Sequence, residues 1–86
     1  MKVLLVEDDQ ALCTALARAL TDAGLLVETS GTGSDADFLV RTERYDVVIL
    51  DLGLPDGDGT RWLAQWRADD IDLPVLGLTA RERWSG

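Results

Sequence analysis

Residues 3–9 read VLLVEDD and residues 46–51 read DVVILD, and these two stretches decide the fold class. In both, an apolar run leads directly into acidic residues. Apolar runs without alternation are typical of strands that are buried on both faces of a parallel sheet. Pro74–Leu78 is a third run of this kind, so we expect buried strands at Lys2–Val6, Asp46–Leu50 and Pro74–Leu78.

The segment between the first two runs predicts a helix followed by a more exposed strand. From Asp9 to Ala23 apolar residues recur at steps of three and four: Leu12, Ala15, Leu16, Ala19, Leu20 and Ala23. Either Asp8 or Asp9 would cap this helix, and Gly24 would end it in a left-handed conformation. Leu25–Ser30 mixes apolar and polar residues, which is typical of an edge strand.

Two further helices are expected. Residues from about Ser34 to Glu43 predict one, with three residues facing inward: Ala36, Leu39 and Val40. Asp58 or Thr60 would open another, whose apolar side carries Trp62, Leu63 and Trp66. The resulting order of strands and helices alternates, which predicts an α/β fold with a doubly wound parallel sheet and helices on both of its faces.

Acidic and hydroxyl residues follow the expected strands. Glu7 and Asp8 come after the first strand, Asp51 after the third, and Thr79 with Ala80 after the last. In doubly wound sheets, sites form at the carboxyl ends of the strands, near the point where the strand order reverses. We therefore expect these side chains to converge at one edge of the sheet.

Carboxylates that share a crevice repel each other unless a cation joins them. Mg²⁺ suits such a site because it prefers hard oxygen ligands and is often held by only one or two carboxylates. The chain has no histidine, and its single cysteine, Cys13, falls in a helix, where a structural role is the simplest reading. A Cys/His zinc site is thereby excluded. A strand-end aspartate beside magnesium can also attack phosphorus.

Composition narrows the function classes. The net charge of −8 disfavours direct binding to nucleic acid by this segment. No apolar run approaches the roughly 20 residues that span a bilayer, so no membrane association is expected. The amino terminus lacks the features of a signal peptide, and one cysteine in 86 residues fits a reducing compartment. We expect a cytoplasmic protein.

Three motifs together resemble a known family. VLLVEDD at 3–9, VVILDLGLPDGDG at 47–59 and PVLGLTA at 74–80 are similar, in order, to the amino-terminal signatures of response-regulator receiver domains. The similarity is greatest to two-component regulators of the OmpR/PhoB type. It implies a flavodoxin-like receiver fold whose last helix, strand and helix are absent, so that residues 1–86 form the amino-terminal part of a truncated domain.

The resemblance assigns roles to five residues. Asp51 is implied as the phosphoacceptor and Thr79 as the switch hydroxyl that hydrogen-bonds the phosphoryl group. Asp8 would bind Mg²⁺ directly, Glu7 would act through water, and the backbone carbonyl of Gly53 would supply a further ligand. Asp51 would itself also be a metal ligand.

The resemblance also implies partners. A sensor histidine kinase would donate the phosphoryl group from a phosphohistidine and dock on the helix at Asp9–Ala23. In the longer regulator, a separate DNA-binding domain would control transcription. The absent part of the domain carries a lysine that contacts the phosphoryl oxygens, so we expect slow or absent phosphoryl transfer. Pro74–Leu78 would become an uncovered edge strand, and we expect self-association through it.

Other interpretations remain open at this point. Asp8 and Asp9 could serve only as helix caps, and Thr79 could bond only to backbone. Asp56–Thr60 is similar to the acidic motif of haloacid-dehalogenase-like, Mg-dependent phosphatases, although Gly53 occupies the place of that family's second acid. A purely structural or interaction fragment is the third alternative.

Overall fold

The computed structural model describes residues 1–78, so Thr79 and Ala80 lie outside the described residues. The elements alternate along the chain: β1 (Lys2–Val6), α1 (Gln10–Asp22), β2 (Leu26–Ser30), α2 (Gly33–Thr42), β3 (Val47–Asp51), β4 (Gly53–Leu54), β5 (Gly57–Asp58), α3 (Gly59–Ala68) and β6 (Val75–Leu78). Apart from the short pair β4 and β5, this is the order that the sequence predicts.

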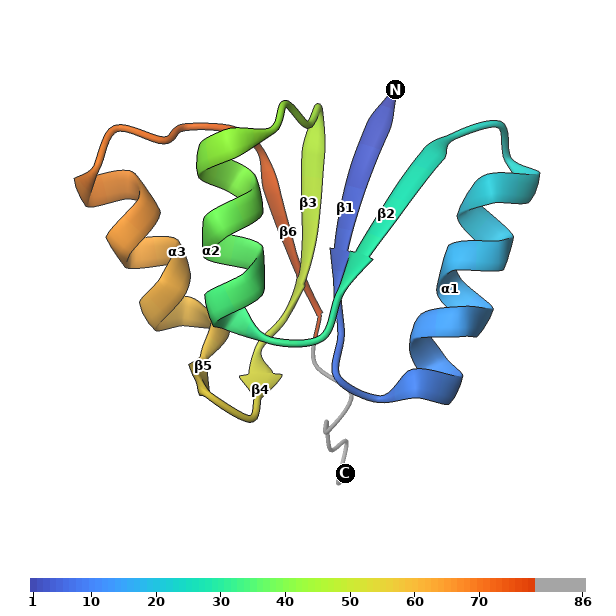
Figure 1. The fold of residues 1–86 in the computed structure, drawn as a ribbon, viewed down its shortest axis with the longest axis horizontal. Coiled ribbons are helices and arrows are strands. Elements are labelled where there is room, and N and C mark those ends of the chain that lie inside the picture. The colour runs from blue at the N-terminus through green and yellow to red at the C-terminus, as the bar shows by residue number, and fades with distance from the viewer. Residues whose placement is uncertain (79–86) are drawn as a thin grey trace, which may run out of the picture.

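Four strands form one parallel sheet in the order β2-β1-β3-β6. The chain first moves outward from β1 to β2 and then crosses to β3 on the other side, so the strand order reverses between β1 and β3. Figure 1 shows α1 on one face of the sheet and α2 with α3 on the other. The predicted doubly wound α/β architecture is confirmed, with its switch point between β1 and β3.

The main core lies between the sheet and the pair α2 and α3. It consists of buried side chains from β1, β3, both helices and the β4 strand: Leu4, Val6, Ala36, Val40, Val48, Leu50, Leu54 and Trp66. Because side chains alternate along a strand, Val3 and Leu5 point to the opposite face, where they are also fully buried. Both faces of β1 are therefore sealed, which explains its uninterrupted apolar sequence.

Helix α1 begins and ends as expected. Asp9 caps it by accepting a hydrogen bond from the Leu12 amide at 3.0 Å, and Gly24 follows it with φ of +93°. The expected inner face was rotated away from the observed one, however, because Ala15 and Ala19 are exposed. The half-buried residues include Cys13 and Ala17 in place of those alanines: Leu12, Cys13, Leu16, Ala17 and Leu20. Long leucine side chains set the helix rotation, whereas alanine tolerates either environment.

Helices α2 and α3 are joined through the indole of Trp66. Its ring is fully buried, and its Nε1–H donates to Asp37 Oδ1 at 2.9 Å. Asp37 also forms an ion pair with Arg41 at 2.9 Å, and Arg41 reaches Asp69 beyond α3 at 2.6 Å. A buried indole N–H without a partner would be costly, so Asp37 makes burial of this tryptophan possible.

The loop after β3 contains a small antiparallel hairpin that the sequence did not reveal. Asp58 was one of two residues expected to open α3, and it does cap this helix through the Thr60 amide at 2.9 Å. The strands β4 and β5 flank Pro55 and Asp56. Asp56 ties the hairpin to α2 by accepting from the amides of Gly33 at 2.8 Å and Ser34 at 2.9 Å. These two bonds lower the pKa of the Asp56 carboxyl.

Strand β6 departs from the expectation of burial on both faces. Within residues 1–78 it is an outer strand of the sheet, paired only with β3, and Leu76 is 58% exposed. Its apolar sequence resembles that of β1, but nothing in the described part of the chain covers it in the same way. Within residues 1–78 the outer edge of β6 has no paired strand, and self-association through it stays a prediction.

Gly33 provides a test of how α2 packs against α3. A Cβ added there would lie 2.0 Å from Trp62 Nε1, so Gly33→Ala must displace the indole. We expect a loss of roughly 1–3 kcal/mol in the free energy of unfolding, measured by urea denaturation. Gly31→Ala is the matched control, because a Cβ at Gly31 meets no atom within 4 Å. Equal stability of the two variants would contradict this packing.

Candidate functional site

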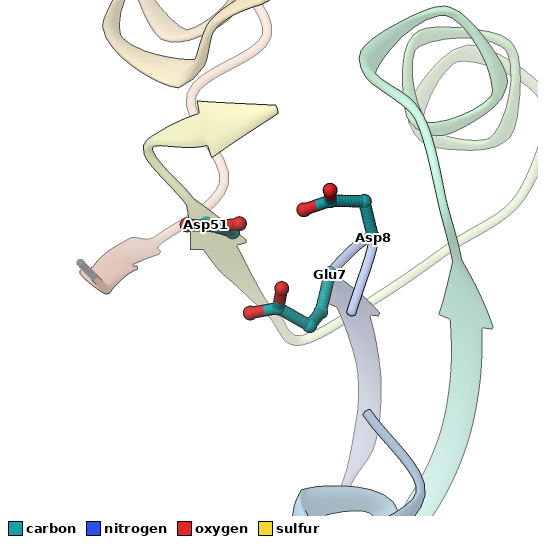
Figure 2. A group of neighbouring side chains, drawn as sticks. All are labelled: Glu7, Asp8 and Asp51. Carbon is teal, nitrogen blue, oxygen red and sulfur yellow. The ribbon is translucent and has the colours of Figure 1, made fainter. Parts of the chain in front are cut away.

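Three carboxylates meet where the strand order reverses. In the sheet register Val6 lies opposite Leu50, so the residues that follow each, Glu7 and Asp51, come side by side. Asp8 is the next residue along the chain from Glu7. Figure 2 shows the three carboxylates gathered around one space, two from the end of β1 and one from the end of β3.

The cluster is tight and partly desolvated. One carboxylate oxygen from each of Glu7, Asp8 and Asp51 lies within 4.8 Å of the other two. Glu7 is 4% exposed and Asp51 is 5% exposed, whereas Asp8 lies open to solvent. Among residues 1–78, no lysine or arginine forms an ion pair with any of them. The site therefore concentrates negative charge that the described chain does not neutralise.

Glu7 carries the clearest sign of this imbalance. Its Oε2 accepts from the Asp9 amide at 3.0 Å, but its Oε1 is buried and has no hydrogen-bond partner in the described structure. Burial raises the pKa of Glu7, the neighbouring charges of Asp51 and Asp8 raise it further, and the Asp9 amide opposes them. An orphaned carboxylate oxygen at this depth is unusual in folded proteins and indicates that another group belongs there.

Asp51 is held in place by backbone on two sides. Its Oδ1 accepts from the Gly53 amide at 3.1 Å. Behind it, the Gly59 amide donates to the Leu52 carbonyl at 3.1 Å. A Cβ on Gly59 would lie 2.7 Å from the Asp51 carbonyl oxygen, so glycine is needed for the start of α3 to approach this loop.

The donor set fits magnesium. All three side chains offer hard oxygen atoms, which Mg²⁺ prefers, and the exposed Asp8 leaves room for the water ligands that this ion usually keeps. A divalent cation would also partner the free Glu7 Oε1 and offset the repulsion between the acids. Softer metals have no nitrogen or sulfur ligand in the cluster.

Each residue singled out in the sequence can now be placed. Glu7, Asp8 and Asp51 come together as expected, and Asp9 rather than Asp8 caps α1. Gly53 adjoins Asp51 through its amide, while the ligand role of its carbonyl remains a prediction. Thr79 lies outside the described residues. The contact of the Asp9 amide with Glu7 was missed, because any residue's amide could make it and no sequence signal marks it.

The fold and the site define a class of protein: a flavodoxin-like α/β domain with an acidic pocket at its switch point. Within that class, the response regulator receiver domain family matches residues 3–85, and the chain belongs to this family. The resemblance drawn from the three motifs is thus confirmed.

The relatives agree with this assignment. The chain is 47% identical to the transcriptional regulatory protein PmrA of Pectobacterium parmentieri over 83 residues, which are 96% of this chain and 37% of PmrA. It is 43% identical to PhoP of Escherichia coli K12 over 84 residues, 98% of this chain and 38% of PhoP. These are relatives of the OmpR/PhoB type. The chain thus spans little more than a third of the length of these relatives.

A solved structure shares the fold. The response regulator TrrA of Thermotoga maritima, determined in complex with Mg²⁺ and BeF, superposes with a TM-score of 0.88 at 26% identity. The match covers 98% of this chain and 73% of TrrA. Among residues 1–78, no helix has the length and apolar character needed to cross a membrane.

The raised pKa of Glu7 predicts that the effect of its charge on stability depends on pH. Because its pKa is raised, ionised Glu7 destabilises the magnesium-free fold at neutral pH, and this penalty disappears below its ordinary value of 4.5. We expect Glu7→Gln to raise the free energy of unfolding at neutral pH and to have little effect below pH 4.5.

Magnesium should stabilise the unmodified chain more than it stabilises Glu7→Gln. Urea denaturation with added Mg²⁺ should show a smaller ion-dependent gain in Glu7→Gln than in the unmodified chain. Asp72→Asn, in an exposed loop, is the control and should keep the full gain. A Glu7→Gln variant that is less stable at neutral pH without magnesium, or that keeps the full gain, would refute this account of the site.

Proposed function

We propose that this chain is a phosphoacceptor receiver module that takes a phosphoryl group on Asp51 from a sensor histidine kinase, with Mg²⁺. In the longer regulator this would control a transcription-regulating output through a separate domain. The observation that carries the proposal is the position of Asp51, buried at the switch point with carboxylate oxygens of Glu7 and Asp8 within 4.8 Å. Membership of the receiver family supports it.

In the proposed step, a carboxylate oxygen of Asp51 forms a bond to phosphorus. The bond from phosphorus to the imidazole nitrogen of the kinase phosphohistidine breaks, and that nitrogen keeps the electron pair. Glu7, Asp8, Asp51 and the Gly53 carbonyl would hold Mg²⁺. When bound, the ion would neutralise the negative charge on the transferring phosphoryl oxygens. The Gly53 amide orients the nucleophile by holding Asp51 Oδ1.

Within residues 1–78, no lysine or arginine pairs with the acidic cluster. Lys2 is the only lysine in the sequence, and it begins β1, at the opposite end from the cluster. There it pairs with Glu28 at 3.4 Å and with Glu43 at 3.8 Å, and it lies over the ring of Tyr45. It therefore cannot contact a phosphoryl group on Asp51. The Thr79 hydroxyl would act afterwards, as the switch that contacts the phosphoryl group.

Labelling with a small acyl phosphate and Mg²⁺ tests the proposal directly. We expect intact-mass spectrometry to detect addition of one phosphoryl group, abolished in Asp51→Asn and retained in the control Asp72→Asn. Labelling that persists in Asp51→Asn would contradict the assigned nucleophile.

Phosphatase activity is the alternative enzyme function, and the geometry disfavours it. The two acids that suggested it are both engaged elsewhere: Asp56 binds the amino terminus of α2 and Asp58 caps α3. Gly53 occupies the position where a second catalytic acid would be needed. Incubation with p-nitrophenyl phosphate and Mg²⁺ should therefore give no turnover, and sustained release of nitrophenol that depends on Asp51 would favour the phosphatase.

The remaining alternative is a fragment with only an interaction role. It predicts no specific magnesium site, whereas a receiver requires one. Mg²⁺ should raise the thermal unfolding midpoint of the unmodified chain and leave that of Asp8→Ala unchanged, because Asp8 would be a direct ligand. An equal rise in both proteins would support the interaction fragment.

A further inference from the structure

A single side chain joins the hairpin after β3 to the start of α2. Asp56 lies between β4 and β5, and its two carboxylate oxygens accept separately from the Gly33 amide at 2.8 Å and from the Ser34 amide at 2.9 Å. These amides belong to the first turn of the helix, where backbone N–H groups have no partner within the helix. The carboxylate also lies at the positive end of the helix dipole. Asp56 therefore caps α2 from a distant part of the chain.

The same helix has a second cap, which comes from its own chain. Thr32 directly precedes α2, and its hydroxyl oxygen accepts from the Asp35 amide at 3.1 Å. The two caps satisfy different amides. Thr32 belongs to the segment that leads into the helix, whereas Asp56 belongs to the loop that follows Asp51. Of the two caps, only Asp56 ties α2 to the acceptor site.

The other end of the hairpin lies against Asp51. Gly53 begins β4, and its amide donates to Asp51 Oδ1 at 3.1 Å. Glycine is the least restricted residue in its backbone angles, so neighbouring contacts must fix the orientation of its peptide groups. Leu54, which is 7% exposed, holds the hairpin on the core side, and Asp56 holds it on α2. Figure 1 shows β4 and β5 beside the first turns of both helices on this face.

We propose that Asp56 is a positioning residue for the acceptor site. By fixing the hairpin on α2 it holds Gly53 in one orientation, in which the amide binds Asp51 and the carbonyl would bind Mg²⁺. This role rests on the proposed function, which assigns that carbonyl as a ligand. Asp56 is not among the acids of the cluster itself. Without its contact to α2, Mg²⁺ binding would also have to order the hairpin, and the lost conformational entropy would weaken the affinity for the ion.

Magnesium affinity distinguishes positioning from helix capping. Asp56→Ala and Thr32→Ala each remove one cap of α2, so both should lower the urea midpoint. We expect Asp56→Ala to raise the Mg²⁺ dissociation constant roughly ten-fold, at the lower end of the range for groups that orient a metal ligand. Thr32→Ala, the matched control, should leave it largely unchanged. Tryptophan fluorescence or calorimetric titration measures the constant in chains that circular dichroism shows to be folded.

An asparagine at the same position provides a graded comparison. Asp56→Asn keeps one acceptor oxygen, but its NH₂ group would face a backbone N–H, so only one of the two bonds to α2 survives. The Mg²⁺ dissociation constant should therefore lie between those of the unmodified chain and Asp56→Ala. The Mg²⁺ concentration that gives half-maximal labelling of Asp51 by the small acyl phosphate should follow the same order.

Coupling of this kind acts in both directions. If the contact of Asp56 with α2 favours Mg²⁺ binding, bound Mg²⁺ must strengthen that contact by the same factor. The Gly33 and Ser34 amides exchange their hydrogens when their bonds to Asp56 open. We expect Mg²⁺ to slow the exchange of these two amides, followed by NMR. The Asp35 amide, which donates to Thr32, should change less.

The results separate this role from the proposed function. An unmodified chain that neither binds Mg²⁺ saturably nor is labelled on Asp51 would overturn both. Normal binding and labelling, with an equal rise of the Mg²⁺ dissociation constant in Asp56→Ala and Thr32→Ala, would overturn the positioning role alone and leave Asp56 as a helix cap. Exchange of the Gly33 and Ser34 amides that is unchanged at saturating Mg²⁺ would also overturn it, and this measurement needs no variant.

Discussion

The repulsion among carboxylates buried at the end of β1 and β3 is the constraint on which the rest of this structure depends. Glu7 and Asp51 are almost fully buried beside each other, and the free Glu7 Oε1 shows that the described chain does not satisfy them. The parallel pairing of β1 with β3 enforces this proximity, because it brings the residues after Val6 and Leu50 together. The fold thus supplies the energy that keeps like charges close, and a bound cation would offset this energy.

The loop between β3 and α3 also holds Asp51 in position. Its hairpin is anchored by Asp56 on the amino terminus of α2, and Gly59 allows α3 to begin against the backbone of Asp51. The Gly53 amide then orients the Asp51 carboxylate. Each of these contacts is local, yet together they connect the nucleophile to both helices on that face. A change in the charge on Asp51 would therefore act most directly on the position of this loop and of the start of α3.

The two faces of the sheet are not equally complete in residues 1–78. The face under α2 and α3 holds a closed core around Trp66, whereas on the α1 face burial decreases from Leu5 to Leu76.

The sequence by itself determined the alternation of strands and helices, the apolar strands and the acids at their carboxyl ends, because short-range periodicity and strand-end position are local properties. It also determined the family, through three motifs in order. It did not determine the rotation of α1, because alanines tolerate either environment. It also did not determine the β4 and β5 hairpin, because this hairpin is anchored by the hydrogen bond from the Gly33 amide to Asp56, two residues that are 23 positions apart in the sequence. Only the tertiary structure decided the burial of Glu7 and the exposure of Leu76, because burial depends on which elements pack beside a strand. The sequence of an apolar strand is similar whether the strand lies in the centre of a sheet or at its edge.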